Sequence, residues 1–149
     1  MSDSAFAWPI RVYFEDTDAG GVVFHASYVN FLERARTEWL RARGVSQRTL
    51  AAERGLLFAI AGLEVRFREP ARLDDELLAT CELTRKGGAS LEFRQQIIRR
   101  MDNAVLADAR VRAACLDAAS FRPRPLPEDL VFGRESEVSS PTNKKTASR

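Results

Sequence analysis

A length of 149 residues and an apolar content of 45% suit one globular domain with a real core. The 23 basic and 21 acidic residues leave a net charge of +2 and are scattered along the chain, which gives no case for nucleic-acid binding. No apolar run approaches the ~20 residues of a membrane span, and the first residues do not resemble a signal peptide, so we expect a cytoplasmic protein.

The first elements can be read from hydrophobic spacing. Alternation of Ile10, Val12 and Phe14 with polar residues predicts a half-buried strand, whose start is marked by Trp8-Pro9. The Asp, Thr and Gly content of residues 16–21 then predicts a turn.

A long helix is predicted over residues 26–43, with Gly44 as the residue that ends it. Charged residues, Arg36 among them, are expected mostly off its apolar side. Its predicted apolar stripe consists of Tyr28, Phe31, Leu32, Ala35, Trp39 and Ala42. Ser46 is expected to cap a short second helix that runs through Glu53 and ends at Gly55.

The remaining pattern is that of strands. Alternating runs predict strands near 63–68, 77–84, 91–97 and 105–115, with turns at 86–88 and 101–103. The last three form an antiparallel meander, which gives the order β-α-β-β-β and an α+β fold. We expect a sheet of about five strands covered on one face by one long helix, with pairing of two copies edge to edge. Residues 1–133 form this domain, and residues 134–149 are expected to be a disordered tail.

The two cysteines, Cys81 and Cys115, lie in alternating runs without a CxxC spacing. His25 is the only histidine, so no second imidazole can complete a metal site. This pattern favours buried, reduced thiols.

The stretch 15–25 gathers polar chemistry where extended chain becomes helix. It holds Asp16, Asp18, Gly20, Gly21 and His25. The first N–H groups of a helix have no partner within it and stabilise negative charge, so a carboxylate beside them suits acyl transfer. The structural alternative is that Asp18 closes an Asx turn or caps the helix. Asp16 is expected to point elsewhere, to a backbone N–H.

Residues 12–41, with the run Glu15-Asp-Thr-Asp-Ala-Gly-Gly-Val-Val-Phe-His25, closely resemble the YbgC branch of the hotdog acyl-CoA thioesterases, which are related to 4-hydroxybenzoyl-CoA thioesterase. The likeness continues through residues 70–75 and the strand pattern to about Pro127. The resemblance implies a hotdog fold, in which an antiparallel sheet wraps a central helix and subunits pair into a continuous sheet with sites at the dimer interface.

The same resemblance implies hydrolysis of acyl-coenzyme A, or of acyl carrier protein in some members, without a metal or organic cofactor. It gives Asp18 the role of catalytic carboxylate and associates His25 with the thioester carbonyl. The carbonyl pocket would consist of Phe14, Gly20, Gly21, Val22 and Phe24. Relatives often have Tyr where this chain has Phe14, so that hydroxyl is absent here.

For coenzyme A binding, the resemblance and the positions of basic residues suggest four positions, which are Arg66, Lys86, Gly87 and Ser90. A homodimer, and from it a dimer of dimers or homotetramer, is the implied assembly. Relatives of this branch are also linked to the Tol-Pal envelope system.

Several alternatives stay open at the level of sequence. Asp18 can attack the thioester directly or act as general base toward water. A hotdog hydratase or dehydratase is a second possible enzyme. A different class is a non-catalytic hotdog module that binds acyl carrier protein or envelope machinery, with Asp18 only structural.

Overall fold

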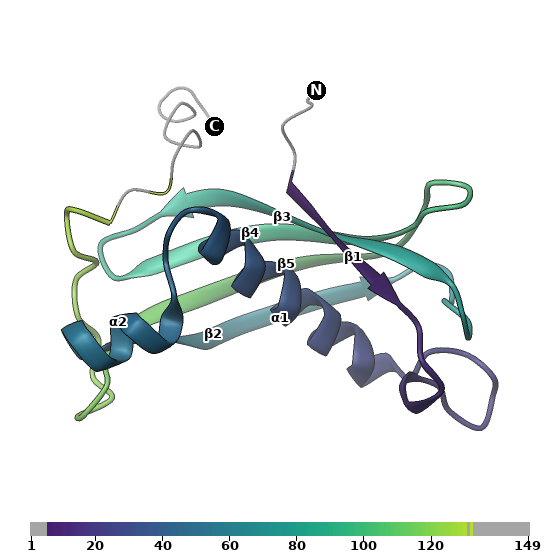
Figure 1. Cartoon of the computed structure of the whole chain (residues 1–149), viewed down its shortest axis with the longest axis horizontal. Helices are drawn as coiled ribbons and strands as arrows, with labels where there is room; N and C mark the ends of the chain where they lie inside the picture. Colours follow the sequence, from purple (N-terminus) through teal and green to yellow (C-terminus); the bar gives the residue numbers. More distant parts are fainter. Residues whose placement is uncertain (1–5, 131, 133–149) are drawn as a thin grey trace. The chain divides into compact units, whose positions relative to one another are not determined.

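The computed structural model describes residues 6–130 and Phe132, and the tail expected at 134–149 lies outside them. Its strands are β1 (Phe6–Arg11), β2 (Leu56–Phe67), β3 (Glu76–Lys86), β4 (Ser90–Arg99) and β5 (Ala104–Asp117), and its helices are α1 (His25–Ala42) and α2 (Gln47–Arg54). The strands form one sheet in the order β1-β3-β4-β5-β2 (Figure 1). The α+β expectation of five strands with one long helix is therefore confirmed.

Strand β2 departs most from the sequence reading. It starts at Leu56 rather than near residue 63, and it lies at the edge of the sheet beside β5. The expected order β-α-β-β-β omitted it, whereas the meander β3-β4-β5 is as expected. Residues 57–62 are only partly buried and do not alternate cleanly, which explains why the period-two pattern failed to mark this half of the strand.

The first strand begins and ends earlier than its pattern suggested. β1 pairs antiparallel with β3 from Phe6 opposite Cys81 to Arg11 opposite Glu76, so Pro9 lies inside the strand instead of marking its start. Proline is tolerated there because β1 is an edge strand, whose outward positions need no N–H donor. Phe14 is not in the strand at all but opens a 3-10 turn, Phe14–Asp16.

By compactness the chain divides into two units, and each is described by itself. The first unit comprises residues 1–39, 64–82 and 94–110, and the second comprises residues 40–63, 83–93 and 111–149.

In the first unit, α1 packs on the sheet through its expected apolar stripe. Tyr28, Phe31, Leu32, Ala35 and Trp39 are all buried. The Tyr28 ring meets the Phe67 ring edge-on at 5.3 Å, and its hydroxyl oxygen accepts a hydrogen bond from the Ala71 N–H at 3.0 Å. These contacts fix the start of α1 against the end of β2 and the segment that follows it.

Two assignments on α1 were wrong. Ala42 is exposed although the stripe included it, and Arg36 is buried although it was placed off the stripe. Position 36 continues the i, i+4 row of Tyr28 and Leu32, which carries the guanidinium inward to Gln95 of β4.

In the second unit, α2 has the ends that the sequence predicted. The Ser46 hydroxyl accepts a hydrogen bond from the Thr49 N–H, and Gly55 ends the helix in the left-handed region at φ 65°. Cys115 is buried here, as Cys81 is in the first unit, and neither forms a disulfide within the described residues. Burial raises the pKa of the Cys115 thiol. None of the helices in the described part of the chain is apolar and long enough to traverse a bilayer.

Candidate active site

The candidate site is a tight loop that leads from β1 into α1. Thr17 and Val23 face each other in an antiparallel bridge, and the Asp18 N–H donates to the Val22 carbonyl at 2.9 Å. The Gly21 N–H donates back to the Asp18 carbonyl at 3.0 Å, and Gly21 has a φ of 82° that side chains rarely adopt. The loop is therefore a small closed hairpin with Asp18 at its tip.

Asp16 is structural, as expected. It is 8% exposed, and its carboxylate accepts a hydrogen bond from the Tyr13 N–H at 2.8 Å. Its backbone carbonyl accepts from the Phe24 N–H at 2.8 Å and from the Ser27 hydroxyl at 3.3 Å. Asp16 thus ties the 3-10 turn to the start of α1, and Asp18 is the acid of the pair that is exposed.

Asp18 makes the Asx turn that was its structural alternative. Its Oδ1 accepts a hydrogen bond from the Gly20 N–H at 2.8 Å. Within the described residues, Oδ2 accepts no hydrogen bond, and the whole side chain is exposed. One carboxylate oxygen is therefore held in place while the other is open to a reactant.

The amide groups of the loop and of the first turn of α1 are only partly available. The N–H groups of Gly20, Gly21, Phe24 and Ser27 already donate to carbonyl or carboxylate oxygens of the protein. Those of His25 and of the next residue, at the first two positions of α1, donate to no acceptor within the described residues. These two amides, which belong to exposed residues, are therefore the candidate donors at the helix N-terminus.

His25 opens α1 with an exposed imidazole. Its ring lies 4.5 Å from the Phe24 ring, centroid to centroid, at an interplanar angle of 46°. Across residues 6–130 and 132, neither ring nitrogen has a hydrogen-bond partner. Phe24 is therefore the contact that orients the histidine ring.

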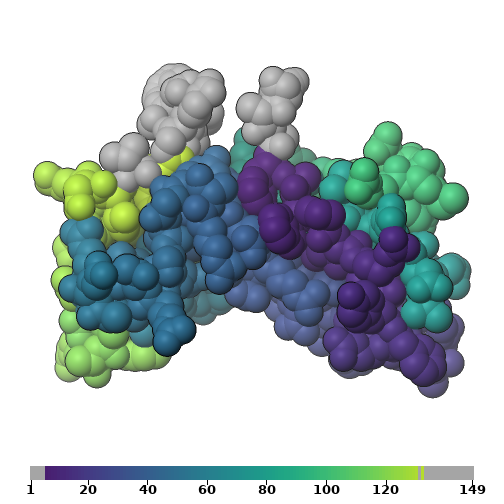
Figure 2. All heavy atoms as spheres, viewed as in Figure 1, coloured from purple at the N-terminus to yellow at the C-terminus, as the bar shows by residue number. Residues whose placement is uncertain are grey.

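The residues expected to form a carbonyl pocket lie at the surface of the single chain. Phe14 is 81% exposed and Phe24 is 44% exposed, and Val22 is half-buried. The space-filling view shows the segment from β1 to the start of α1, in purple, at the surface (Figure 2). A single chain thus leaves the Asp18 carboxylate open to solvent.

The four positions expected to bind coenzyme A fall in two places. Arg66 belongs to β2 and lines a hollow in the first unit. The other three lie in the second unit, where Lys86 ends β3, Gly87 lies in the turn and Ser90 begins β4. The Lys86 ammonium donates to the Leu130 carbonyl at 2.9 Å and lies over the Phe132 ring. The Gly87 N–H donates to the Ser90 carbonyl at 2.8 Å. Contacts within the unit therefore already engage Lys86 and Gly87.

The loop offers an exposed carboxylate, and the start of α1 that follows it offers two amides that have no acceptor within the described residues. No cluster of three or more His, Cys, Asp and Glu side chains in the described segments could hold a metal ion. A carboxylate with one committed and one free oxygen can attack a carbonyl carbon or accept a proton from water. The two amides can donate to an oxygen that gains negative charge.

Residues 12–131 match the family model of the thioesterase-like superfamily. The match covers far more than half of the sequence, and the chain therefore belongs to the thioesterase-like superfamily.

Particular relatives lie within the branch that the sequence resembled. The chain is 49% identical over 131 residues to the acyl-CoA thioester hydrolase YbgC of Escherichia coli O6:H1, a match that covers 88% of this chain and 96% of that protein. It is 42% identical over 130 residues to the acyl-CoA thioesterase YbgC of Haemophilus influenzae, covering 87% of this chain and 94% of the relative.

Solved structures agree with the sequence matches. A probable thioesterase from Bartonella henselae has a TM-score of 0.78 at 34% identity, and the match covers 83% of this chain and 99% of that one. A protein from Thermus thermophilus has a TM-score of 0.77 at 31% identity, with coverage of 83% and 92%. The hotdog fold expected from the resemblance is thus confirmed.

Proposed function

We propose that this chain hydrolyses acyl-coenzyme A thioesters, with Asp18 as the catalytic carboxylate. The observation that carries the proposal is the asymmetry of that carboxylate, since Oδ1 is fixed by the Gly20 N–H while Oδ2 is uncommitted in the described residues. The activities named for the two YbgC relatives support the substrate class.

The proposed reaction starts with the thioester carbonyl oxygen accepting hydrogen bonds from the free amides of His25 and its successor in α1. Asp18 Oδ2 then either attacks the carbonyl carbon to form a mixed anhydride or takes a proton from an attacking water. In both cases the carbon–sulfur bond breaks and coenzyme A leaves as the thiolate, which takes up a proton. Water supplies the second oxygen of the released carboxylic acid, directly or by opening the anhydride.

The His25 ring has a supporting role in this proposal. Its contact with Phe24 holds it at the first position of α1, next to the amides that would bind the carbonyl. Phe14, Val22 and Phe24 would form the wall of the carbonyl pocket, together with the turn made by the two glycines.

We also propose that a second copy of the chain covers the site. The observation in favour is the exposure of large apolar side chains near it, because Phe14, Phe24, Phe67 and Leu73 are each 44% exposed or more. Isolated apolar side chains at a surface are ordinary, but several of them around a reactive carboxylate favour burial by a partner. Light scattering of the purified chain should give the mass of a dimer or of a dimer of dimers, and a monomer would contradict this.

Thiol release from a panel of acyl-coenzyme A substrates tests the main proposal. Asp18→Asn keeps an oxygen that can accept from the Gly20 N–H, so the loop should fold while the turnover rate falls by roughly 100-fold or more. Glu15→Gln is the matched control, because it removes an exposed carboxylate three positions away. The same panel presented on acyl carrier protein would identify the preferred carrier.

The competing hypothesis is that the protein is a non-catalytic module that binds acyl carrier protein or envelope machinery. The Asx turn favours it, because Asp18 would then only shape the loop. Equal turnover in Asp18→Asn and wild type would remove Asp18 from the mechanism. Absence of thiol release from every substrate in wild type would favour the binding module.

A further inference from the structure

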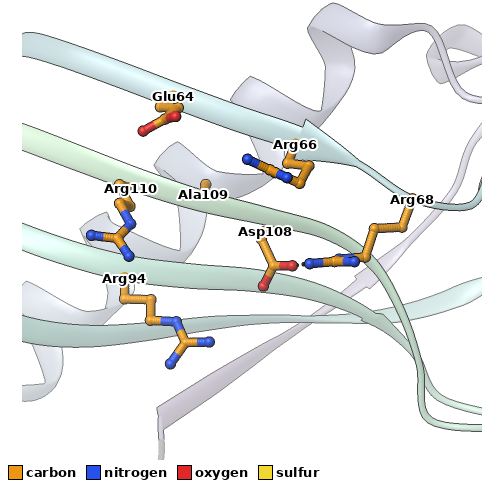
Figure 3. A pocket seen from close by; sticks show the side chains of 7 residues that line it. All are labelled: Glu64, Arg66, Arg68, Arg94, Asp108, Ala109 and Arg110. Carbon is orange, nitrogen blue, oxygen red and sulfur yellow. Dashed lines mark hydrogen bonds and ion pairs between the residues drawn. The ribbon is translucent and has the colours of Figure 1, made fainter.

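A second concentration of charge lies in the first unit, apart from the loop that carries Asp18. Three neighbouring strands, β4, β5 and β2, present charged side chains around a hollow of about 240 Å³ (Figure 3). The side chains lining it come from Glu64, Arg66, Arg68, Arg94, Asp108 and Arg110. Asp108 and Arg110 were not considered at the level of sequence, although they alternate with buried residues along β5 and so share one face.

One acid of this cluster is already neutralised. Asp108 Oδ2 accepts a hydrogen bond from Arg68 Nε at 2.6 Å, and Asp108 Oδ1 accepts from Gln96 Nε2 at 2.7 Å. Both oxygens are thereby committed, and these bonds lower the pKa of the Asp108 carboxyl. Arg68 and Asp108 together form a fixed ion pair in the wall of the hollow.

The other three arginines are not matched by acids. Arg66, Arg94 and Arg110 are exposed and make no ion pair or hydrogen bond with any described residue. Glu64 is the one remaining carboxylate in the lining. The lining therefore holds four arginines and two carboxylates, which gives it a net charge of +2. This equals the net charge of the whole chain.

The spacing of these arginines suits a small anion with more than one charged group. Arg66 and Arg94 stand on the strands that flank β5, and adjacent strands lie ~4.8 Å apart, so their backbones are separated by roughly 10 Å. Two arginine side chains at this separation can both contact one small anion that lies between them. Each guanidinium group can donate two parallel hydrogen bonds to the oxygens of a phosphate. The hollow is smaller than the roughly 300–1,000 Å³ of typical small-molecule pockets, so it suits a charged group and not a whole ligand.

We propose that this arginine hollow binds the diphosphate group of an organic phosphate. A second copy of the same surface is disfavoured, because like charges would face each other across the contact. Two sources share the required chemistry, namely the nucleotide end of coenzyme A and a free nucleoside diphosphate. Only the coenzyme A source rests on the proposed function, since binding of a free diphosphate needs no hydrolysis.

Titration calorimetry with inorganic pyrophosphate at low ionic strength tests the proposal. We expect wild type to bind, and Arg66→Gln/Arg110→Gln to raise the dissociation constant by about fivefold or more through loss of two charge-assisted contacts. Arg48→Gln, which removes an exposed arginine of α2, is the matched control and should bind as wild type does. Binding should weaken as salt is added.

A variant that is expected to bind more tightly separates loss of the site from misfolding. Glu64→Gln removes the unpaired carboxylate from the lining and should lower the dissociation constant, which damage to the fold would not do. The proposal is overturned if wild type does not bind pyrophosphate, if the double variant binds it equally well, or if Arg48→Gln loses as much affinity. It is also overturned if the double variant changes only the oligomeric state.

Parallel titrations with coenzyme A and with adenosine diphosphate identify the source. Loss of coenzyme A affinity in the double variant would assign the hollow to the nucleotide end of the substrate, and loss of adenosine diphosphate affinity alone would assign it to a free nucleotide. The Asp18→Asn variant should bind pyrophosphate normally, so failure of the catalytic proposal and failure of this one give different results.

Discussion

Arg36 brings a positive charge into the interior of the first unit, where it is 8% exposed. Its Nη1 donates to Gln95 Oε1 at 3.0 Å, and Gln95 Nε2 in turn donates to the Leu32 carbonyl at 3.0 Å and the Thr80 carbonyl at 3.1 Å. Burial lowers the pKa of Arg36, yet a guanidinium stays protonated in proteins. Gln95 is therefore the link that joins α1 to β3 and β4 through polar contacts.

Replacing Gln95 should reveal the cost of that buried charge. Gln95→Leu leaves the Arg36 guanidinium without its acceptor, and we expect the free energy of unfolding to fall by about 2–3 kcal/mol. Adding Arg36→Leu to that variant should recover part of the loss, because replacing both partners of a buried polar pair by apolar groups is often nearly neutral. Urea denaturation of the two single variants and the double variant gives the coupling energy. Simple additivity of the two losses would contradict the link.

At the scale of elements, the hairpin before α1 uses its two glycines for different reasons. A methyl group on Gly20 would lie 3.2 Å from Asp18 Oδ1, whereas a methyl group on Gly21 would meet no atom within 4 Å. Gly21 is instead required by its φ of 82°, where a side chain strains the backbone. Gly20 thus makes room for the carboxylate, and Gly21 permits the turn.

This difference predicts two distinct phenotypes. Gly21→Ala should lower the free energy of unfolding by about 1 kcal/mol through backbone strain. Gly20→Ala should displace the Asp18 carboxylate by a few tenths of an ångström, and so reduce turnover by more than its effect on stability explains. Chemical denaturation and steady-state kinetics on both variants make the comparison. A larger loss of turnover in Gly21→Ala would argue against this division of roles.

At the scale of the whole molecule, we expect Asp108 to contribute to the loss of stability at low pH. Its hydrogen bonds to Gln96 and Arg68 lower the pKa of the carboxyl in the folded chain. A carboxyl of this kind stabilises the fold fully above its unfolded pKa of ~4, and the contribution disappears as the pH falls through the lower folded value. Asp108→Asn should therefore be less stable than wild type near neutral pH, with a difference that shrinks below about pH 4. Thermal unfolding across this range checks the sign, and a difference that widens in acid would refute it.

Much of the architecture followed from periodicity because one face of each element is buried. The helix over 26–43 and the caps of the short second helix were predicted to within a residue or two, since Gly44 and Gly55 have the positive φ that marks a helix end. The first half of β2 could not be predicted, because half-buried edge residues do not alternate. The burial of Arg36 was not predicted, although the sequence holds one sign of it. Gln95, its hydrogen-bond acceptor, is a polar residue within the apolar row of Leu91, Phe93 and Ile97.

The candidate loop was located by its residue types, whereas its hydrogen bonds were not predictable. Composition suggested a carboxylate beside helix amides, and the family resemblance singled out Asp18. Which amides are free depends on the hairpin from Thr17 to Val23 and on the bond from Phe24 to Asp16, which form only when the loop closes on itself. The arginine hollow depends on strand order, because Arg66 and Arg94 lie on either side of β5 only in the folded sheet.

The proline at position 9 has a consequence for solubility. Because its ring nitrogen carries no hydrogen, the outer side of β1 is a defective template for any further strand, including one from a fibril. β2, the strand at the opposite edge of the sheet, contains no proline and is twice as long, with 12 residues against 6. We therefore expect strands of other chains to add at β2 more readily than at β1. A Pro9→Val variant should aggregate at a lower temperature than wild type, which turbidity measured during heating would show.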